Sequence, residues 1–361
     1  MKRIVFVILI YSLLNTVFAQ NISNYRKGIL QFEEELIQKL TNNEPGTSVA
    51  ITYDDKIVFE KYYGMANLER GIKLNSKHHL GVASMSKQFT GMAILSLAHE
   101  GKLKLDDNIL KYFPNLPIGD RIINIKQLLS HTSGLPELTQ NRTFMNQIEK
   151  PHTVEQIFEM GFAGEYRSKV GEKFIYCNTG FTICVALVEK LSNMSFSEYM
   201  STMIFAPLNM KDSYICDYNR DAITAVPRYV QDSLTYNRAI NMHFSNLIGG
   251  GSMVSNVQDM AKWGMALVSG KNLPANYKKI WESVLLNSGE STGYGLGLGV
   301  NHVNGKEFYY HPGMGSGMNS IFLIFPEEKI SITVIRNMSK PKVSSKEIAL
   351  TAAQFLFPEE E

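Results

Sequence analysis

Residues 320–337, SIFLIFPEEKISITVIRN, consist of two β-rich runs joined by a polar turn. Turn-forming and charged residues between two such runs predict a β-hairpin. Near the other end of the chain, residues 47–64, TSVAITYDDKIVFEKYYG, repeat this arrangement around Asp54 and Asp55. Because the two hairpins stand near opposite ends, the sequence predicts one antiparallel sheet to which both ends contribute.

Helical patterns surround and separate these hairpins. Residues 25–40 are amphipathic with a helical period, and residues 343–357 form a closing helical run. Residues 89–246 are mostly helical in pattern and predict a lobe inserted into the α/β lobe. We therefore expect an α+β fold of two lobes, with a functional site in the cleft between them.

Composition narrows the possible functions. The chain has 361 residues, of which 44% are hydrophobic, and a net charge of +2. This length allows one or two domains, and the balanced charge gives no support for nucleic acid as a partner. Cys177, Cys184 and Cys216 show no Cys-x-x-Cys spacing, so we expect small buried hydrophobes rather than a disulfide framework or a zinc site. We expect no cofactor and no metal.

Residues 1–19 have the layout of a secretory signal. Lys2 and Arg3 precede a short apolar run, and small residues lead up to Ala19. Cleavage after Ala19 would release residues 20–361 into the periplasm or the medium, with no stable membrane span. The alternative is a membrane anchor, but the apolar run is short for a span.

A serine and a lysine stand at the start of an otherwise apolar helical stretch, residues 81–101, GVASMSKQFTGMAILSLAHEG. Ser84 and Lys87 are three residues apart and share one helical face. Unpaired N–H groups at a helix N-terminus favour an oxyanion, and a neighbouring amine with a lowered pKa can take the serine proton. The alternative is that Ser84 caps the helix and Lys87 is solvated.

A phenol and a carboxamide project from one short turn in residues 171–193, GEKFIYCNTGFTICVALVEKLSN. Tyr176 could relay protons, and Asn178 could hold a substrate carbonyl. The alternative is that Asn178 caps the following helix and Tyr176 is a half-buried ring.

A histidine precedes a glycine-rich run in residues 309–326, YYHPGMGSGMNSIFLIFP. Gly313 and the glycines after it permit close approach of the backbone to a ligand. His311 could equally be a surface residue of an ordinary loop. A phosphate cradle is conceivable, although neither glycine-rich phosphate-binding pattern is present.

Ser-x-x-Lys, Tyr-x-Asn and His-x-Gly in this order resemble the motifs of the serine penicillin-recognising superfamily. The resemblance is to class C β-lactamases, DD-peptidases and the related esterases and D-aminopeptidases, and the parallel motifs of class A enzymes follow the same order. Further segments resemble this family: LLSHTSGLPE (128–137), IFAPLNMKDS (204–213), GGGSMVSNVQDMAKW (249–263) and GYGLGLGV (293–300). The resemblance covers nearly all of the predicted mature chain.

The resemblance implies a role for each motif residue. Ser84 would be the acylated nucleophile, and Lys87 its base partner. Tyr176 would pass protons to the leaving group and activate the deacylating water, while Asn178 would bind a substrate amide. The N–H groups of Ser84 and Met314 would form the oxyanion hole, commonly the largest electrostatic contribution to acyl transfer.

The third motif departs from the class C pattern. His311, Pro312 and Gly313 stand where those β-lactamases have Lys-Thr-Gly, so a fixed cation and a hydroxyl for a substrate carboxylate are absent. We still assign His311 and Gly313 to substrate binding. His131 is expected to be a hydrogen-bonded scaffold residue without a catalytic role.

The motifs favour an exported serine hydrolase acting on small esters or on amides and peptides that contain D-amino acids. One alternative is a DD-peptidase or weak β-lactamase that acts on peptidoglycan peptides or β-lactams. An alternative of another class is a catalytically idle module that binds wall peptides.

Overall fold

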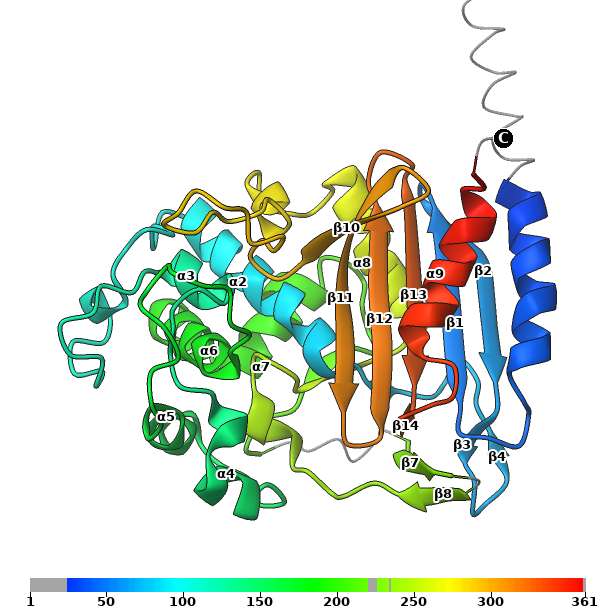
Figure 1. Ribbon diagram of the computed structural model, residues 1–361, viewed down its shortest axis with the longest axis horizontal. Coiled ribbons are helices and arrows are strands. Elements are labelled where there is room, and N and C mark those ends of the chain that lie inside the picture. The colour runs from blue at the N-terminus through cyan, green and yellow to red at the C-terminus, as the bar shows by residue number, and fades with distance from the viewer. Residues whose placement is uncertain (1–24, 220–225, 234, 360–361) are drawn as a thin grey trace, which may run out of the picture.

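The computed structural model describes residues 25–219, 226–233 and 235–359 (Figure 1). The predicted signal of residues 1–19 lies outside the described residues. The largest sheet has six antiparallel strands in the order β10-β11-β12-β13-β1-β2. These strands are β1 (Thr47–Tyr53), β2 (Lys56–Tyr63), β10 (Gly299–Val303), β11 (Lys306–Gly315), β12 (Met318–Phe325) and β13 (Ile330–Arg336).

The first and last parts of the chain meet in the middle of this sheet. Strand β1 pairs with β13 from Thr47 opposite Arg336 to Tyr53 opposite Ile330. Nearly every residue of these two strands is buried, which suits central strands covered on both faces. Both predicted hairpins and their union in one antiparallel sheet are confirmed, as is the α+β class.

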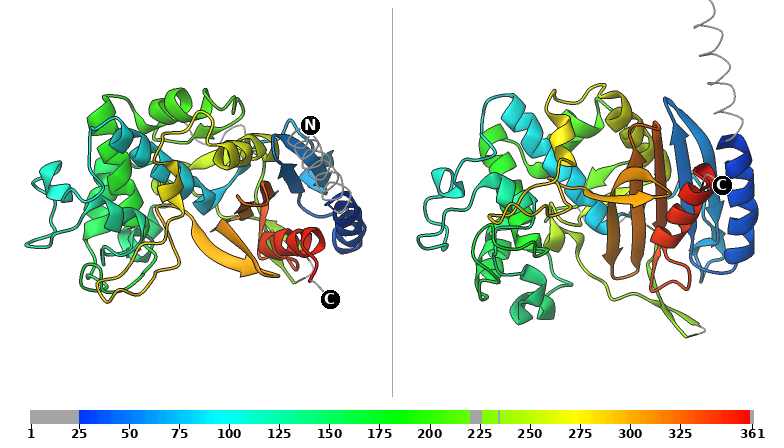
Figure 2. Two further views of the ribbon diagram at one scale, coloured as in Figure 1. Left: turned by 90° about the horizontal axis from the view of Figure 1, so that it is seen from above. Right: turned by 45° about the horizontal axis from the view of Figure 1, so that its top comes forward.

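Helices cover both faces of the sheet (Figures 1 and 2). The helix of residues 25–39 and α9 (Ser345–Leu356) pack on one face, and α8 (Val257–Ser269) packs on the other. Side chains of β12 alternate between these two layers: Ile321 and Leu323 join the first, and Phe322 and Ile324 join the second.

Between β2 and β10, the chain forms most of its helices. Besides α8, they are α2 (Lys87–His99), α3 (Ile125–Leu129), α4 (Arg142–Asn146), α5 (Val154–Phe162), α6 (Asn178–Ser192) and α7 (Phe196–Tyr199), which continues as a π-helix (Met200–Phe205). Helix α2 is buried almost all round and packs against α6, so it forms the centre of the larger core cluster. No helix in the described ranges is long and apolar enough to cross a membrane.

Short strands complete the structure. They are β3 (Met65–Asn67) with β4 (Ile72–Lys73); β5 (Leu80–Gly81) with β9 (Met253–Ser255) and β6 (Tyr214–Ile215); and β7 (Tyr229–Asp232) with β8 (Thr235–Arg238) and β14 (Met338–Ser339). The three cysteines are buried, as expected.

Candidate active site

A tight turn places Ser84 between β5 and α2. Ala83–Ser86 form a 3₁₀-helix, and α2 begins at Lys87. The sequence suggested one α-helix here; the 3₁₀ geometry eclipses residues three apart, which also brings the two side chains together. Lys87 Nζ lies 3.4 Å from Ser84 Oγ. The preceding Ala83 has a φ of 49°, a strained conformation for a residue with a Cβ.

Lys87 is fully buried, so the alternative of a solvated lysine is wrong. Its Nζ donates to Asn178 Oδ1 at 2.8 Å and to the Gly250 carbonyl at 2.7 Å. Burial lowers the pKa of Lys87 to about 7, although Glu137 and, more weakly, Cys177 act to raise it. An appreciable fraction of this amine is therefore neutral near pH 7.

Asn178 is held by a carboxylate from a distant loop. Helix α6 begins at Asn178 with Cys177 as its N-cap residue, so Asn178 is not the N-cap. Glu137 Oε2 accepts the Asn178 backbone N–H at 2.6 Å, and Glu137 Oε1 accepts from Asn178 Nδ2 at 2.8 Å. The backbone N–H and hydroxyl of Thr139 also donate to Glu137. Glu137 thus fixes the side-chain amide with its oxygen toward Lys87.

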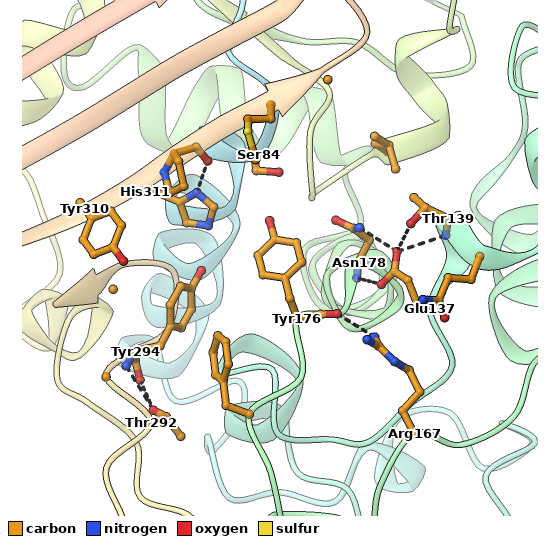
Figure 3. Close-up of a pocket in the computed structure, with 18 of the residues that line it drawn as sticks. Ser84, Glu137, Thr139, Arg167, Tyr176, Asn178, Thr292, Tyr294, Tyr310 and His311 are labelled. Carbon is orange, nitrogen blue, oxygen red and sulfur yellow. Dashed lines mark hydrogen bonds between the residues drawn. The ribbon is translucent and has the colours of Figure 1, made fainter. Parts of the chain in front are cut away.

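Figure 3 shows the Tyr176 side chain among the residues that line the pocket, with its hydroxyl directed toward Ser84. Burial of the phenol raises the pKa of Tyr176 above its usual value, and hydrogen bonding with Ser84 offsets this only in part. Lys87 Nζ lies 4.8 Å from the ring centroid. Arg167 Nη1 donates to the Tyr176 carbonyl at 2.7 Å and so anchors the backbone.

The third motif is part of strand β11 rather than a loop. His311 is only 1% exposed, so the alternative of a surface histidine is wrong. Its Nδ1 lies 2.6 Å from the Pro312 carbonyl oxygen. Burial first, and then the charge of Lys87, lower the pKa of His311 to about 3. The ring is therefore neutral at pH 7.

Glycine at position 313 lets β11 approach the nucleophile turn. A Cβ there would lie 2.1 Å from Ser320 Oγ and 2.3 Å from the Val82 carbonyl oxygen. Pairing of β11 with β10 ends at Tyr310, while β11 beyond it contacts the turn that carries Ser84. Any larger residue at 313 would push the strand away from this turn.

The residues that the sequence singled out meet at one pocket of about 770 Å³. Ser84, Tyr176, Asn178, His311 and Met314 line it. Lys87 and Gly313 do not line this pocket. Lys87 contacts two residues that do, Ser84 and Asn178, through its Nζ. Gly313 lies against the turn that carries Ser84.

Sequence reasoning did not single out Glu137 or the carbonyl of Gly250. The first belongs to a segment noted for its family resemblance, and the second to a run of three glycines, but neither shows a local pattern for its role. Within the described ranges, no three His, Cys, Asp or Glu side chains are grouped so that they could hold a metal ion.

The sequence of this chain matches a known protein family. The family model described as Beta-lactamase matches residues 20–356. Protein flp from Staphylococcus aureus (strain MRSA252) is 27% identical over 313 residues, which cover 83% of this chain and 60% of flp. The chain thus spans about three fifths of the length of such curated relatives.

Solved structures share the fold over most of the chain. The octameric penicillin-binding protein homologue from Pyrococcus abyssi aligns with a TM-score of 0.78 and 26% identity, covering 92% of this chain and 78% of that protein. D-amino acid amidase from Ochrobactrum anthropi SV3 aligns with a TM-score of 0.77 and 21% identity, covering 92% and 98% of the two chains.

Proposed function

The chain belongs to the Beta-lactamase family, and on that basis we propose that it is an exported serine hydrolase that forms an acyl-enzyme on Ser84. Its substrates would be small esters, or amides and peptides that contain D-amino acids. Export follows from the predicted signal of residues 1–19. We also propose that residues 20–361 form one hydrolase domain, with residues 89–246 as its inserted helical lobe.

The surroundings of Lys87 carry this proposal. A neutral amine has two N–H groups and one lone pair. The two N–H groups are taken by two oxygens that can only accept, Asn178 Oδ1 and the Gly250 carbonyl. The lone pair is left for the hydroxyl proton of Ser84, 3.4 Å away. With a pKa of about 7, Lys87 is suited to general-base work at neutral pH.

The reaction then runs in two steps. Ser84 Oγ bonds to the substrate carbonyl carbon while its proton moves to Lys87, and the carbonyl becomes an oxyanion. Tyr176 gives its proton to the leaving group as the ester or amide bond breaks, and it recovers one from Lys87. A water then attacks the acyl carbon, and its proton goes to Tyr176 while Tyr176 passes its own proton to Lys87. As the acyl bond to Ser84 breaks, Tyr176 gives a proton to Ser84 Oγ and recovers one from Lys87, which restores the free enzyme.

The free edge of β11 supports an oxyanion hole. Pro312 has no N–H. If its nitrogen lies on the edge of β11 that faces away from β12, no hydrogen bond between β11 and β12 is lost. Met314, two residues later, then has its N–H on the same edge. Strand β11 contacts the turn that carries Ser84. The Ser84 and Met314 N–H groups would therefore converge on one oxygen.

The third motif favours substrates that do not need a carboxylate group for binding. His311 is buried and neutral, and Pro312 has no side-chain donor, so this strand offers no fixed cation. Glu137 and Arg167 line the same pocket and bring one charge of each sign. A neutral ester or an amino-acid amide suits this balance better than an anionic β-lactam. One neighbour of the same fold is a D-amino acid amidase.

Turnover of a substrate panel tests the proposal. The purified mature chain should hydrolyse a short nitrophenyl ester and a D-amino acid amide with a higher kcat/KM than a penicillin or a D-alanyl-D-alanine peptide. The reverse ranking would favour the DD-peptidase or weak β-lactamase alternative. Binding of wall peptides without turnover of any substrate would favour the idle module.

A further inference from the structure

Three polar atoms close to the nucleophile are buried and have no hydrogen-bond partner in the described part of the chain. They are His131 Nε2, Tyr294 Oη and His311 Nε2. Their residues are 0%, 8% and 1% exposed, respectively. A buried polar group without a partner costs free energy, so three such atoms in one place need an explanation.

The three side chains are in contact. The ring of Tyr294 lies 5.0 Å from that of His131 and 5.9 Å from that of His311, centroid to centroid. Figure 3 shows the Tyr294 hydroxyl pointing toward the His311 imidazole. His131 in turn stacks on the Tyr176 ring at 4.2 Å and 30°. The cluster of His131, Tyr294 and His311 is therefore in contact with the ring of Tyr176, which is proposed to move protons.

Their hydrogen-bonding capacities are complementary. The Cys177 N–H donates to His131 Nδ1 at 3.0 Å, so a neutral His131 carries its proton on Nε2. The Pro312 carbonyl can only accept, so His311 carries its proton on Nδ1 and presents a lone pair on Nε2. Burial and the charge of Lys87 lower the pKa of both histidines, which keeps them neutral. The three rings that pack together thus carry one unpartnered donor, one unpartnered acceptor and one unpartnered hydroxyl.

We propose that one ordered water binds among these three atoms. It accepts a hydrogen bond from the His131 Nε2–H, donates one to His311 Nε2, and has the Tyr294 hydroxyl as its third partner. A buried water in proteins typically has about three polar partners. Water fits because it donates and accepts at once.

The bound water ties the loop of His131 to strand β11 and fixes the ring that stacks on Tyr176. His131 has a φ of 59°, so its loop is strained and depends on such contacts. His131 and Tyr294 are thus positioning residues that act through Tyr176. This kinetic consequence rests on the proposed function, whereas the water site does not.

Crystallography and ¹⁵N NMR of histidines test the site without any substrate. We expect water density within hydrogen-bond distance of all three atoms, Nε2–H on His131 and Nδ1–H on His311. Tyr294→Phe should shift the Nε2 resonances of both histidines. The matched control is Tyr63→Phe, which removes another buried hydroxyl without a partner in the described residues, in the cluster beneath residues 25–39. Opposite tautomers, or direct bonds among the three side chains without water, would overturn the proposal.

Kinetics test the positioning role. Tyr294→Phe should lower kcat about tenfold with KM unchanged, the size expected for one lost hydrogen bond. His131→Asn, which keeps an acceptor for the Cys177 N–H and tolerates a positive φ, should do the same. Tyr63→Phe should leave kcat unchanged. Equal kcat values for Tyr294→Phe and Tyr63→Phe would refute the positioning role, and a wild-type chain without turnover would refute the proposed function instead.

Discussion

Replacing Lys87 by methionine should change how stability depends on pH. In the folded chain the pKa of Lys87 is lowered to about 7, against an ordinary value of 10.5. Between these two values the unfolded chain binds more protons than the folded chain, so wild-type stability gains a contribution that rises with pH. Below about pH 7 both states are protonated and the wild type bears the full cost of burying the charge. Lys87→Met removes this contribution.

The size of the effect follows from the shift. The free energy of unfolding of the wild type, relative to Lys87→Met, should rise by ~1.36 kcal/mol per pH unit within the window. From pH 7 to pH 9 this amounts to roughly 2.7 kcal/mol. The variant also leaves Asn178 Oδ1 and the Gly250 carbonyl without their donor, at about 1–3 kcal/mol each. That cost does not depend on pH, so the slope isolates the titration.

Urea denaturation followed by circular dichroism at several pH values between 6 and 9 measures this difference. The expected result is a growing gap between the two chains as the pH rises through the window. Parallel stability curves would mean that Lys87 keeps an ordinary pKa in the folded chain. In that case it is protonated at neutral pH and cannot be the base.

Substitutions at three other places in the site have defined outcomes. Tyr176→Phe should lower kcat at least about 100-fold in steady-state assays of ester hydrolysis; a near-native kcat would remove Tyr176 from proton transfer. Ala83→Val should destabilise the chain by more than about 1 kcal/mol in urea, whereas Ala83→Gly should be tolerated, because only glycine relaxes at a φ of 49°. Equal stabilities would show that this turn is not strained. His311→Lys combined with Pro312→Thr should raise the ratio of penicillin acylation to neutral-ester turnover about ten- to a hundredfold, and the ratio corrects for any loss common to both reactions that follows from removing the His311 ring. An unchanged ratio would exclude the third motif as the determinant of substrate choice.

Local patterns predicted those parts of the fold whose structure is set locally. Both hairpins and the helix of residues 25–39 could be predicted because each has its own apolar pattern and turn or end signals. The register that joins Thr47 to Arg336 could not, because it depends on residues almost 300 positions apart. The positive φ of Ala83 is imposed by packing and has no local signal.

In the candidate site, too, local contacts could be predicted from the sequence and long-range contacts could not. The i to i+3 spacing of Ser84 and Lys87 predicted their contact, because it is a local geometric relation. Glu137 holds Asn178 across 41 residues of chain and could not be found from spacing. His131 is a scaffold residue, as expected, but it bonds the Cys177 N–H, while its neighbouring hydroxyls bond each other. The loop conformation decides those partners, and only the tertiary structure determines it.

Mass spectrometry after treatment with a fluorophosphonate tests the acyl-enzyme claim most directly. The purified mature chain should gain the mass of one adduct, and peptide mapping should locate it on Ser84. Ser84→Ala, which removes one oxygen and should retain the wild-type circular dichroism spectrum, should gain none. An adduct on another residue, an adduct that persists in folded Ser84→Ala, or a wild-type chain that stays unlabelled would contradict Ser84 as the nucleophile.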